Sequence, residues 1–252
     1  MTARRFAATI AYHGANFAGS QRQANARTVQ QEVEAAAERL FGAPTRVAMA
    51  GRTDSGVHAI GQVAAFSAVT TLDAATVGRA LNAHLPEDVA VRFVDEVLPD
   101  FDPRYWARKR SYRYTILQGE ARDPMLRDRA WHVREPLDAG VMNRAAEALL
   151  GRHDFRACSG PLEPGRNPVR TVTLARWQVQ GHLLEFEIAA EAFLPQMVRR
   201  IVGGLTRTGK GAQSIETFVR LLAEAEPGSI GPTAPARGLS LQQVSYEEGY
   251  LA

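Results

Sequence analysis

The stretch RRFAATIAY at residues 4–12 indicates the fold class, because its apolar side chains recur at every second position. These side chains are Phe6, Ala8, Ile10 and Tyr12. Such alternation predicts a strand with one buried face. A Gly-rich loop follows, and then Thr28 with Gln31 three residues later, a capping-box pattern that predicts the start of a helix. A strand followed by a capped helix indicates a protein that combines a sheet with helices.

Apolar patterns along the rest of the chain predict the order β-α-β-β-α-β, given roughly twice. Helices are expected at 28–41, 74–85, 138–150, 195–205 and 215–225. Strands are expected at 4–12, 45–50, 61–66, 89–94, 111–117, 130–134, 171–180, 183–189 and 239–246. Pro195 is expected in the first turn of its helix. The predicted fold class is α+β, with two related, ferredoxin-like α/β halves joined into a mainly antiparallel sheet.

A stretch rich in proline and charge at 98–108 predicts the junction between the halves. We place the boundary so that 1–103 form the N-terminal half and 104–252 form the C-terminal half. Long loops are expected at 151–170 and 226–238. The first loop carries Arg152, Arg156, Arg166 and Arg170, which either contact a substrate or form an ordinary solvated surface.

Composition limits the class of protein and its partners. The chain has 252 residues, a formal net charge of +3 and 28 arginines against two lysines among its 30 cationic residues. Arginine suits phosphate binding and base stacking, so an RNA partner is permitted, although a GC-rich genome also favours arginine codons. Cys158 is the single cysteine, which excludes an intramolecular disulfide. No apolar run reaches the ~20 residues of a membrane span, and no signal peptide is recognisable, so a soluble cytoplasmic protein is expected.

The densest cluster of candidate functional groups is AGRTDSGVHA at 50–59. Asp54 lies between two glycines, which allow a sharp turn and a close approach of substrate. Arg52 could hold the Asp54 carboxylate ionised, ready to act as a nucleophile or base. A surface turn rich in Asp and Gly is the alternative. His58 is a candidate for substrate binding or for a hydrogen bond within the turn. Asp54 and His58 lack a third ligand at suitable spacing, so no metal is expected.

Basic and aromatic residues alternate at 104–114, RYWARKRSYRY. Basic groups hold phosphates and aromatic faces stack on unpaired bases, which makes RNA the favoured partner. Tyr112 and Tyr114 share one face of the expected strand, and either face could line a base pocket or the protein core. In the third segment, 193–204, Arg199 lies on a mostly apolar helix and needs a carboxylate partner, for which Asp54 is a candidate.

These segments resemble the bacterial tRNA pseudouridine(38–40) synthase family over essentially the whole chain. GRTDSGVHA at 51–59 is similar to its catalytic loop, KRSYRY at 109–114 to its tyrosine strand and FLPQMVRRIVG at 193–203 to its arginine helix. Four shorter stretches also match the family: QRQ at 21–23, TVQ at 28–30, RNPVR at 166–170 and GPTAPARGL at 231–239. The resemblance implies two α/β halves around a central antiparallel sheet, with an active cleft between them.

The resemblance also assigns roles to residues. It implies Asp54 as the nucleophile, Tyr112 against the target base, Arg199 paired with Asp54, and Arg52 at the place of the flipped nucleotide. It further implies a homodimer that needs no cofactor or metal and that modifies the anticodon stem-loop of tRNA. The chain departs from the family pattern at a few positions: His13, Ser20 and Pro195-Gln196. These departures bear on the packing of the N-terminal loop and on the contacts near Arg199.

Two other functions are compatible with the same residues. A non-catalytic RNA-binding protein would use the basic and aromatic surface without forming product. A metal-dependent phosphohydrolase would use Asp54 and His58 as ligands, and its activity would be lost with a chelator.

Overall fold

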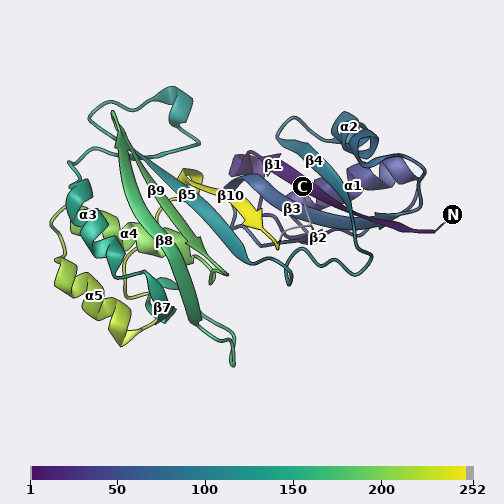
Figure 1. The fold of residues 1–252 in the computed structure, drawn as a ribbon. Coiled ribbons are helices and arrows are strands. Elements are labelled where there is room, and N and C mark those ends of the chain that lie inside the picture. The colour runs from purple at the N-terminus through teal and green to yellow at the C-terminus, as the bar shows by residue number, and fades with distance from the viewer. Residues whose placement is uncertain (1, 248–252) are drawn as a thin grey trace. The chain divides into compact units, whose positions relative to one another are not determined.

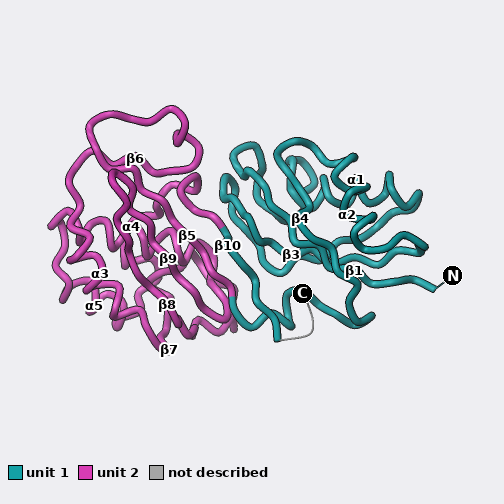
Figure 2. The backbone as a smooth tube through the Cα atoms, turned by 45° about the horizontal axis from the view of Figure 1, so that its top comes forward, with its two compact units in different colours: residues 1–109, 241–252 teal, residues 110–240 magenta. Residues whose placement is uncertain are grey.

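The computed structural model describes residues 2–247, and they form helices together with mainly antiparallel strands (Figure 1). The predicted α+β class is confirmed. The chain forms two compact units, which Figure 2 shows in two colours: Met1–Lys109 with Leu241–Ala252, and Arg110–Ser240. The last strand thus belongs mostly with the first unit, and a boundary between folding domains after residue 103 stays a prediction. None of the helices in the described part of the chain is long and apolar enough to span a membrane.

The first unit is an antiparallel sheet with two helices packed against it (Figure 1). Its strands are β1 (Arg4–Tyr12), β2 (Ala48–Met49), β3 (His58–Ala68), β4 (Val89–Val97) and the greater part of β10 (Leu239–Ser245). Strands β4, β1, β3 and β10 lie side by side in this order, and β2 pairs with β3. Its helices are α1 (Val29–Phe41) and α2 (Ala74–His84).

Local sequence explains where these helices begin and end. Thr28 and Gln31 form the predicted capping box at the start of α1, and Gly42 ends that helix in the left-handed conformation. Asp73 caps α2 by accepting a hydrogen bond from the Thr76 N–H at 2.7 Å. Both helices cover the face of the sheet on which the alternating apolar residues of β1 lie.

The second unit combines five strands with three helices. The strands are β5 (Lys109–Gln118), β6 (Trp131–Val133), β7 (Gly151–Asp154), β8 (Val169–Gln180) and β9 (Leu183–Ala190). They lie in the order β5, β9, β8, β7, and β6 pairs with β5 in parallel. The helices are α3 (Ala139–Glu147), α4 (Met197–Gly209) and α5 (Ile215–Glu224). The β-α-β-β-α-β order predicted for both halves is found in β1 to β4 of the first unit, whereas the second unit runs β-β-α-β-β-β-α-α.

Three predicted elements differ from the structure. The strand expected at 45–50 is confined to β2. Helix α3 ends early because the Leu149 N–H bonds to the Ala146 carbonyl, three residues back, and Gly151 then opens β7 instead of a loop. Pro195 lies before α4, not in its first turn, because Gln196 at the start of the helix has a left-handed backbone conformation with a φ of 60°.

Candidate active site

Asp54 lies on the loop between β2 and β3, and hydrogen bonds tie this loop to the segment after β1. The Ser20 N–H donates to the Thr53 carbonyl at 3.1 Å, and the Thr53 N–H donates to the Ser20 hydroxyl at 2.9 Å. The Tyr12 and Thr53 hydroxyl oxygens are 2.8 Å apart. Burial raises the pKa of Tyr12 to about 12, so this hydroxyl stays protonated at neutral pH. Because all three partners are buried, the bonds fix the backbone beside Asp54 with little competition from water.

Two glycines allow the segment after β1 to approach the Asp54 loop this closely. A Cβ atom on Gly14 would lie 2.0 Å from the Val57 carbonyl oxygen. Gly19 has a φ of 102°, and a Cβ atom there would lie 2.8 Å from the Thr53 carbonyl oxygen. A larger residue at either position would force the two segments apart. The position of the loop is therefore encoded partly in residues 30 or more positions before it.

Asp54 itself begins a tight turn. Its carbonyl accepts a hydrogen bond from the Val57 N–H at 3.1 Å, and Gly56 takes a φ of 79° within the turn. The Gly56 N–H and the Ser55 hydroxyl both donate to the Phe17 carbonyl, at 3.3 and 3.1 Å. Asp54 is half-buried. A backbone held in this way limits the region that the Asp54 carboxylate can reach, which suits a group that must meet one reacting atom.

The other two candidates on this loop differ in exposure. Arg52 is exposed, and among residues 2–247 it has neither an ion pair nor a hydrogen bond with Asp54. Its guanidinium is therefore open to a partner from outside. His58 is buried, and its Nδ1 accepts the Gly14 N–H at 3.0 Å. The His58 ring packs 4.7 Å from that of His13, centroid to centroid. His58 thus acts as a further brace of the loop.

In the second unit, β5 carries Tyr112 and Tyr114 on one face. Tyr114 is fully buried and donates its hydroxyl to the Pro235 carbonyl at 2.8 Å. Tyr114 is therefore part of the core, and burial raises the pKa of its hydroxyl. Tyr112 is 8% exposed, and its ring meets that of Phe193 edge to face at 5.0 Å. Tyr112 is thus buried and packed against Phe193.

Arg199 lies in the first turns of α4 and is held by the loop before β10. Its Nε donates to the Ala234 carbonyl at 2.8 Å, and the Ala234 N–H donates to the Arg199 carbonyl at 3.1 Å. The backbones of this loop and of α4 are in direct contact. A Cβ atom on Gly203 would lie 1.8 Å from the Pro232 carbonyl oxygen. This contact requires glycine at position 203 and allows the loop to lie directly against α4.

The candidate residues are distributed over the two units. Arg52, Asp54 and His58 share one loop. Tyr112 lies on β5 and Arg199 lies on α4. The loop at 230–235 contacts both elements, since Pro235 accepts a hydrogen bond from Tyr114 of β5 and Ala234 accepts one from Arg199 of α4. The ion pair of Asp54 with Arg199 would join the two units and stays a prediction. Within the described chain, no group of three or more His, Cys, Asp or Glu side chains is placed to hold a metal ion.

Sequence reasoning missed part of what holds the loop. Tyr12 was assigned only to a strand, and Thr53 was given no role. Ser20 was singled out only as a departure from the family pattern, yet its hydroxyl accepts the Thr53 N–H. The unusual residue at position 20 was the one available signal for this brace.

Comparison with known proteins agrees with this arrangement. The sequence model of the family described as tRNA pseudouridine synthase matches residues 8–106 and 145–247. Those segments include the Asp54 loop and the Arg199 helix, whereas the strand of Tyr112 lies between them. The match places the chain in the class of RNA-modifying isomerases.

Relatives cover almost the full chain. The tRNA pseudouridine synthase A of Chloroflexus aurantiacus is 43% identical over 98% of this chain and 91% of its own length. The protein of that name from Myxococcus xanthus is 42% identical over 97% of this chain and 93% of its own length. That of Moorella thermoacetica is 43% identical over 94% and 98%. The chain belongs to the tRNA pseudouridine synthase family.

Proposed function

We propose that this protein converts uridine to pseudouridine at positions 38–40, in the anticodon stem-loop of tRNA, with Asp54 as its nucleophile. The observation that carries the proposal is the braced turn of Asp54, tied on both sides to the segment after β1. A carboxylate on a backbone held so firmly serves a reaction that depends on position. This function implies a cytoplasmic enzyme, because tRNA is modified there.

The reaction is an isomerisation in which atoms and electrons balance. The C1′–N1 bond of the nucleotide breaks, the uracil turns, and a C1′–C5 bond forms. The proton on C5 leaves, and N1 gains a proton. Asp54 adds to the nucleotide as a nucleophile and is released when the new bond is complete. Nothing is oxidised or hydrolysed, and the proton lost from C5 balances the proton gained at N1.

The other candidates act on the position of the nucleotide. The target base must leave its stack, which costs a few kcal/mol. Arg52, exposed beside Asp54, occupies the space that the base vacates and offsets part of this cost. Tyr112 contacts the extruded base, and Arg199 pairs with the Asp54 carboxylate. His58 supports substrate binding by holding the Asp54 loop in place.

The test compares Asp54→Asn with the wild-type protein on an unmodified tRNA transcript. The variant is expected to bind the transcript with unchanged affinity and to form no pseudouridine, as mapped nucleotide by nucleotide. Asp100→Asn is the matched control, since Asp100 is an exposed carboxylate of the same unit. Pseudouridine formed by Asp54→Asn at an appreciable rate would refute the nucleophile, and product outside positions 38–40 would refute the specificity.

We also propose that the protein works as a homodimer and that one tRNA contacts both copies of the chain. Light scattering of the purified protein, with and without tRNA, tests this directly. A monomer at micromolar concentration in both conditions would exclude it.

A further inference from the structure

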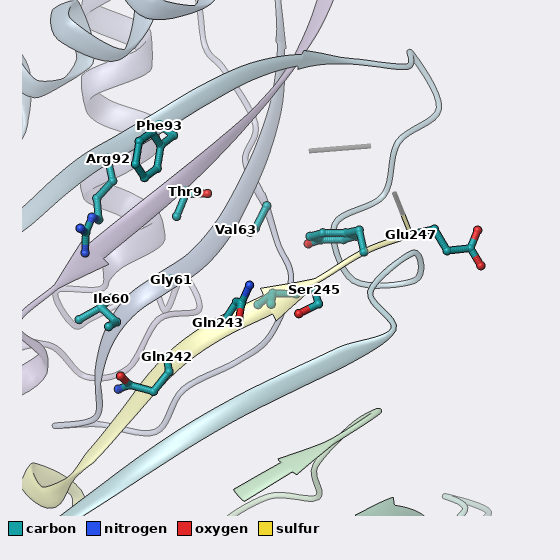
Figure 3. A pocket seen from close by; sticks show the side chains of 12 residues that line it. Thr9, Ile60, Gly61, Val63, Arg92, Phe93, Gln242, Gln243, Ser245 and Glu247 are labelled. Atoms are coloured by element: carbon teal, nitrogen blue, oxygen red, sulfur yellow. The ribbon is translucent and has the colours of Figure 1, made fainter. Parts of the chain in front are cut away.

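A hollow of about 430 Å³ lies over the sheet of the first unit (Figure 3). Its floor is formed by Thr9 of β1 with Gly61 and Val63 of β3. Phe93 and Arg92 of β4 form one side of the hollow, and residues 242–247 form the other. The volume lies within the range of about 300–1,000 Å³ that is usual for small-ligand sites. This hollow has no role in the proposed chemistry of Asp54.

The sheet register explains why a hollow forms here. Phe93, Thr9 and Val63 are direct neighbours across β4, β1 and β3, so they lie in one row on one face. That face is opposite to the one covered by α1 and α2. At Gly61 a Cβ atom would lie 2.2 Å from the Gln242 carbonyl oxygen, so glycine is required where β10 approaches β3. Small side chains in the middle of the row leave space between Phe93 and β10.

Phe93 is unusual in this position because it is 65% exposed. A large aromatic ring on the open face of a sheet remains in contact with water unless another molecule covers it. Single-stranded nucleic acids are commonly bound by rings of this kind, on which an unpaired base stacks. In Figure 3, the Phe93 ring stands next to Arg92 and Thr9 at the side of the hollow.

Three of the polar groups that line the hollow are also without partners in the described part of the chain. The Arg92 guanidinium, the Gln243 amide and the Thr9 hydroxyl form no hydrogen bond or ion pair within residues 2–247. An arginine binds phosphate, and an amide on the opposite side of the hollow can bond to the edge of a base. The one carboxylate that lines the hollow, Glu247, is paired with Arg108 and lies far from Arg92 in Figure 3.

We propose that this hollow is a second RNA-binding subsite, in which an unpaired nucleotide stacks on Phe93 while Arg92 holds its phosphate. The subsite rests on the proposed function, since the RNA is the tRNA substrate. It would bind a nucleotide other than the one that is isomerised. Its contribution is therefore to the affinity for tRNA and to the alignment of the tRNA on the protein, not to the reaction itself.

A nucleotide fits the hollow better than a second protein does. Phe93 and Ile60 are the exposed large apolar side chains that line it. A stable protein interface buries about 800 Å² on each partner, with an apolar centre. Two apolar side chains around a hollow with unpaired donors make a poor centre of that kind, whereas they match one base with its phosphate.

The test measures binding of an unmodified tRNA transcript in the Asp54→Asn background, where turnover does not interfere. Phe93→Ala is expected to weaken binding about 5- to 150-fold, the range for loss of one stacked base. Phe93→Trp is expected to restore it. Arg92→Gln is expected to weaken binding and to lower the slope of log Kd against log salt by about one. Val69→Ala, which shortens an apolar side chain of the same unit that is 56% exposed, is the matched control.

Each outcome decides a separate question. Unchanged affinity of Phe93→Ala would overturn the subsite, even if wild-type protein forms pseudouridine. A change of oligomeric state in Phe93→Ala, with unchanged affinity for tRNA per subunit, would show that a protein covers the hollow. Wild-type protein that binds the transcript through Phe93 but forms no pseudouridine would leave the subsite standing and refute the proposed reaction.

Discussion

Arg199 and Ala234 are joined by two reciprocal hydrogen bonds, one from the Arg199 side chain and one from the Ala234 backbone. Arg199 Nε donates to the Ala234 carbonyl at 2.8 Å, and the Ala234 N–H donates to the Arg199 carbonyl at 3.1 Å. The guanidinium thus takes its orientation from a loop 35 residues further along the chain. That loop is itself fixed where Gly203 meets Pro232. An arginine held by its Nε presents its terminal nitrogens in one direction, as pairing with a carboxylate requires.

Gly203→Ala is expected to disturb this arrangement. Its Cβ atom would lie 1.8 Å from the Pro232 carbonyl oxygen, so α4 and the loop must separate. Overpacking of this kind costs about 1–3 kcal/mol of folding free energy. We expect that loss in urea unfolding, and a fall in kcat larger than any rise in KM. Gly140→Ala, in the first turn of α3, is the control and should change stability by less than about 1 kcal/mol. Wild-type kcat in a folded Gly203→Ala protein would show that the loop does not position Arg199.

Tyr12→Phe tests the brace of the Asp54 loop. The variant loses the 2.8 Å contact with the Thr53 hydroxyl and leaves a buried hydroxyl without this partner. Such a loss costs about 1–3 kcal/mol, and the looser turn should slow single-turnover formation of pseudouridine. Tyr105→Phe is the control, because Tyr105 is 80% exposed. Equal turnover rates for the two variants would show that the Tyr12–Thr53 contact does not contribute to catalysis.

Features that depend on neighbouring residues could be predicted from the sequence, whereas features that depend on contacts between distant residues could not. The start and end of α1 follow from Thr28 and Gly42, which act within one turn of the helix. Strand β7 was missed because a glycine after a helix resembles a loop, and pairing of Gly151 with Val172 makes it a strand. In the candidate site, Arg52, Asp54 and His58 were predicted together because they lie within seven residues of one another in the chain. The Tyr12–Thr53 contact spans 41 residues, and no periodicity indicates it.

Arg27 and Asp88 give the first unit a defined sensitivity to acid. Arg27 donates to both carboxylate oxygens of Asp88, at 2.7 and 2.9 Å, and its guanidinium lies 4.2 Å from the centre of the Phe17 ring. The hydrogen bonds from Arg27 lower the pKa of Asp88. A folded-state pKa below the unfolded value of about 3.9 contributes stability that is present above that value and is lost as the pH falls through the folded-state pKa.

Asp88→Asn is therefore expected to lower the free energy of unfolding at pH 7 and to have a smaller effect at pH 3, which lies below the unfolded-state value of about 3.9. The pair is partly exposed, so the loss at pH 7 is no more than about 1 kcal/mol. Urea unfolding at both pH values measures it, with Asp100→Asn as a control that should show no difference. An equal loss for Asp88→Asn at pH 7 and pH 3 would mean that packing, not charge, explains the contribution of Asp88.

Arg52→Gln tests the role of the exposed guanidinium beside Asp54. Arg52 has no ion pair within residues 2–247, so its replacement should leave the stability of the protein unchanged. If Arg52 contacts the RNA backbone, the variant binds tRNA more weakly, and the slope of log Kd against log salt falls by about one. Arg39→Gln removes another exposed arginine of the same unit and should alter neither quantity. If Arg52 instead fills the space left by the flipped base, the variant keeps the salt slope and loses kcat, because the cost of unstacking is no longer offset.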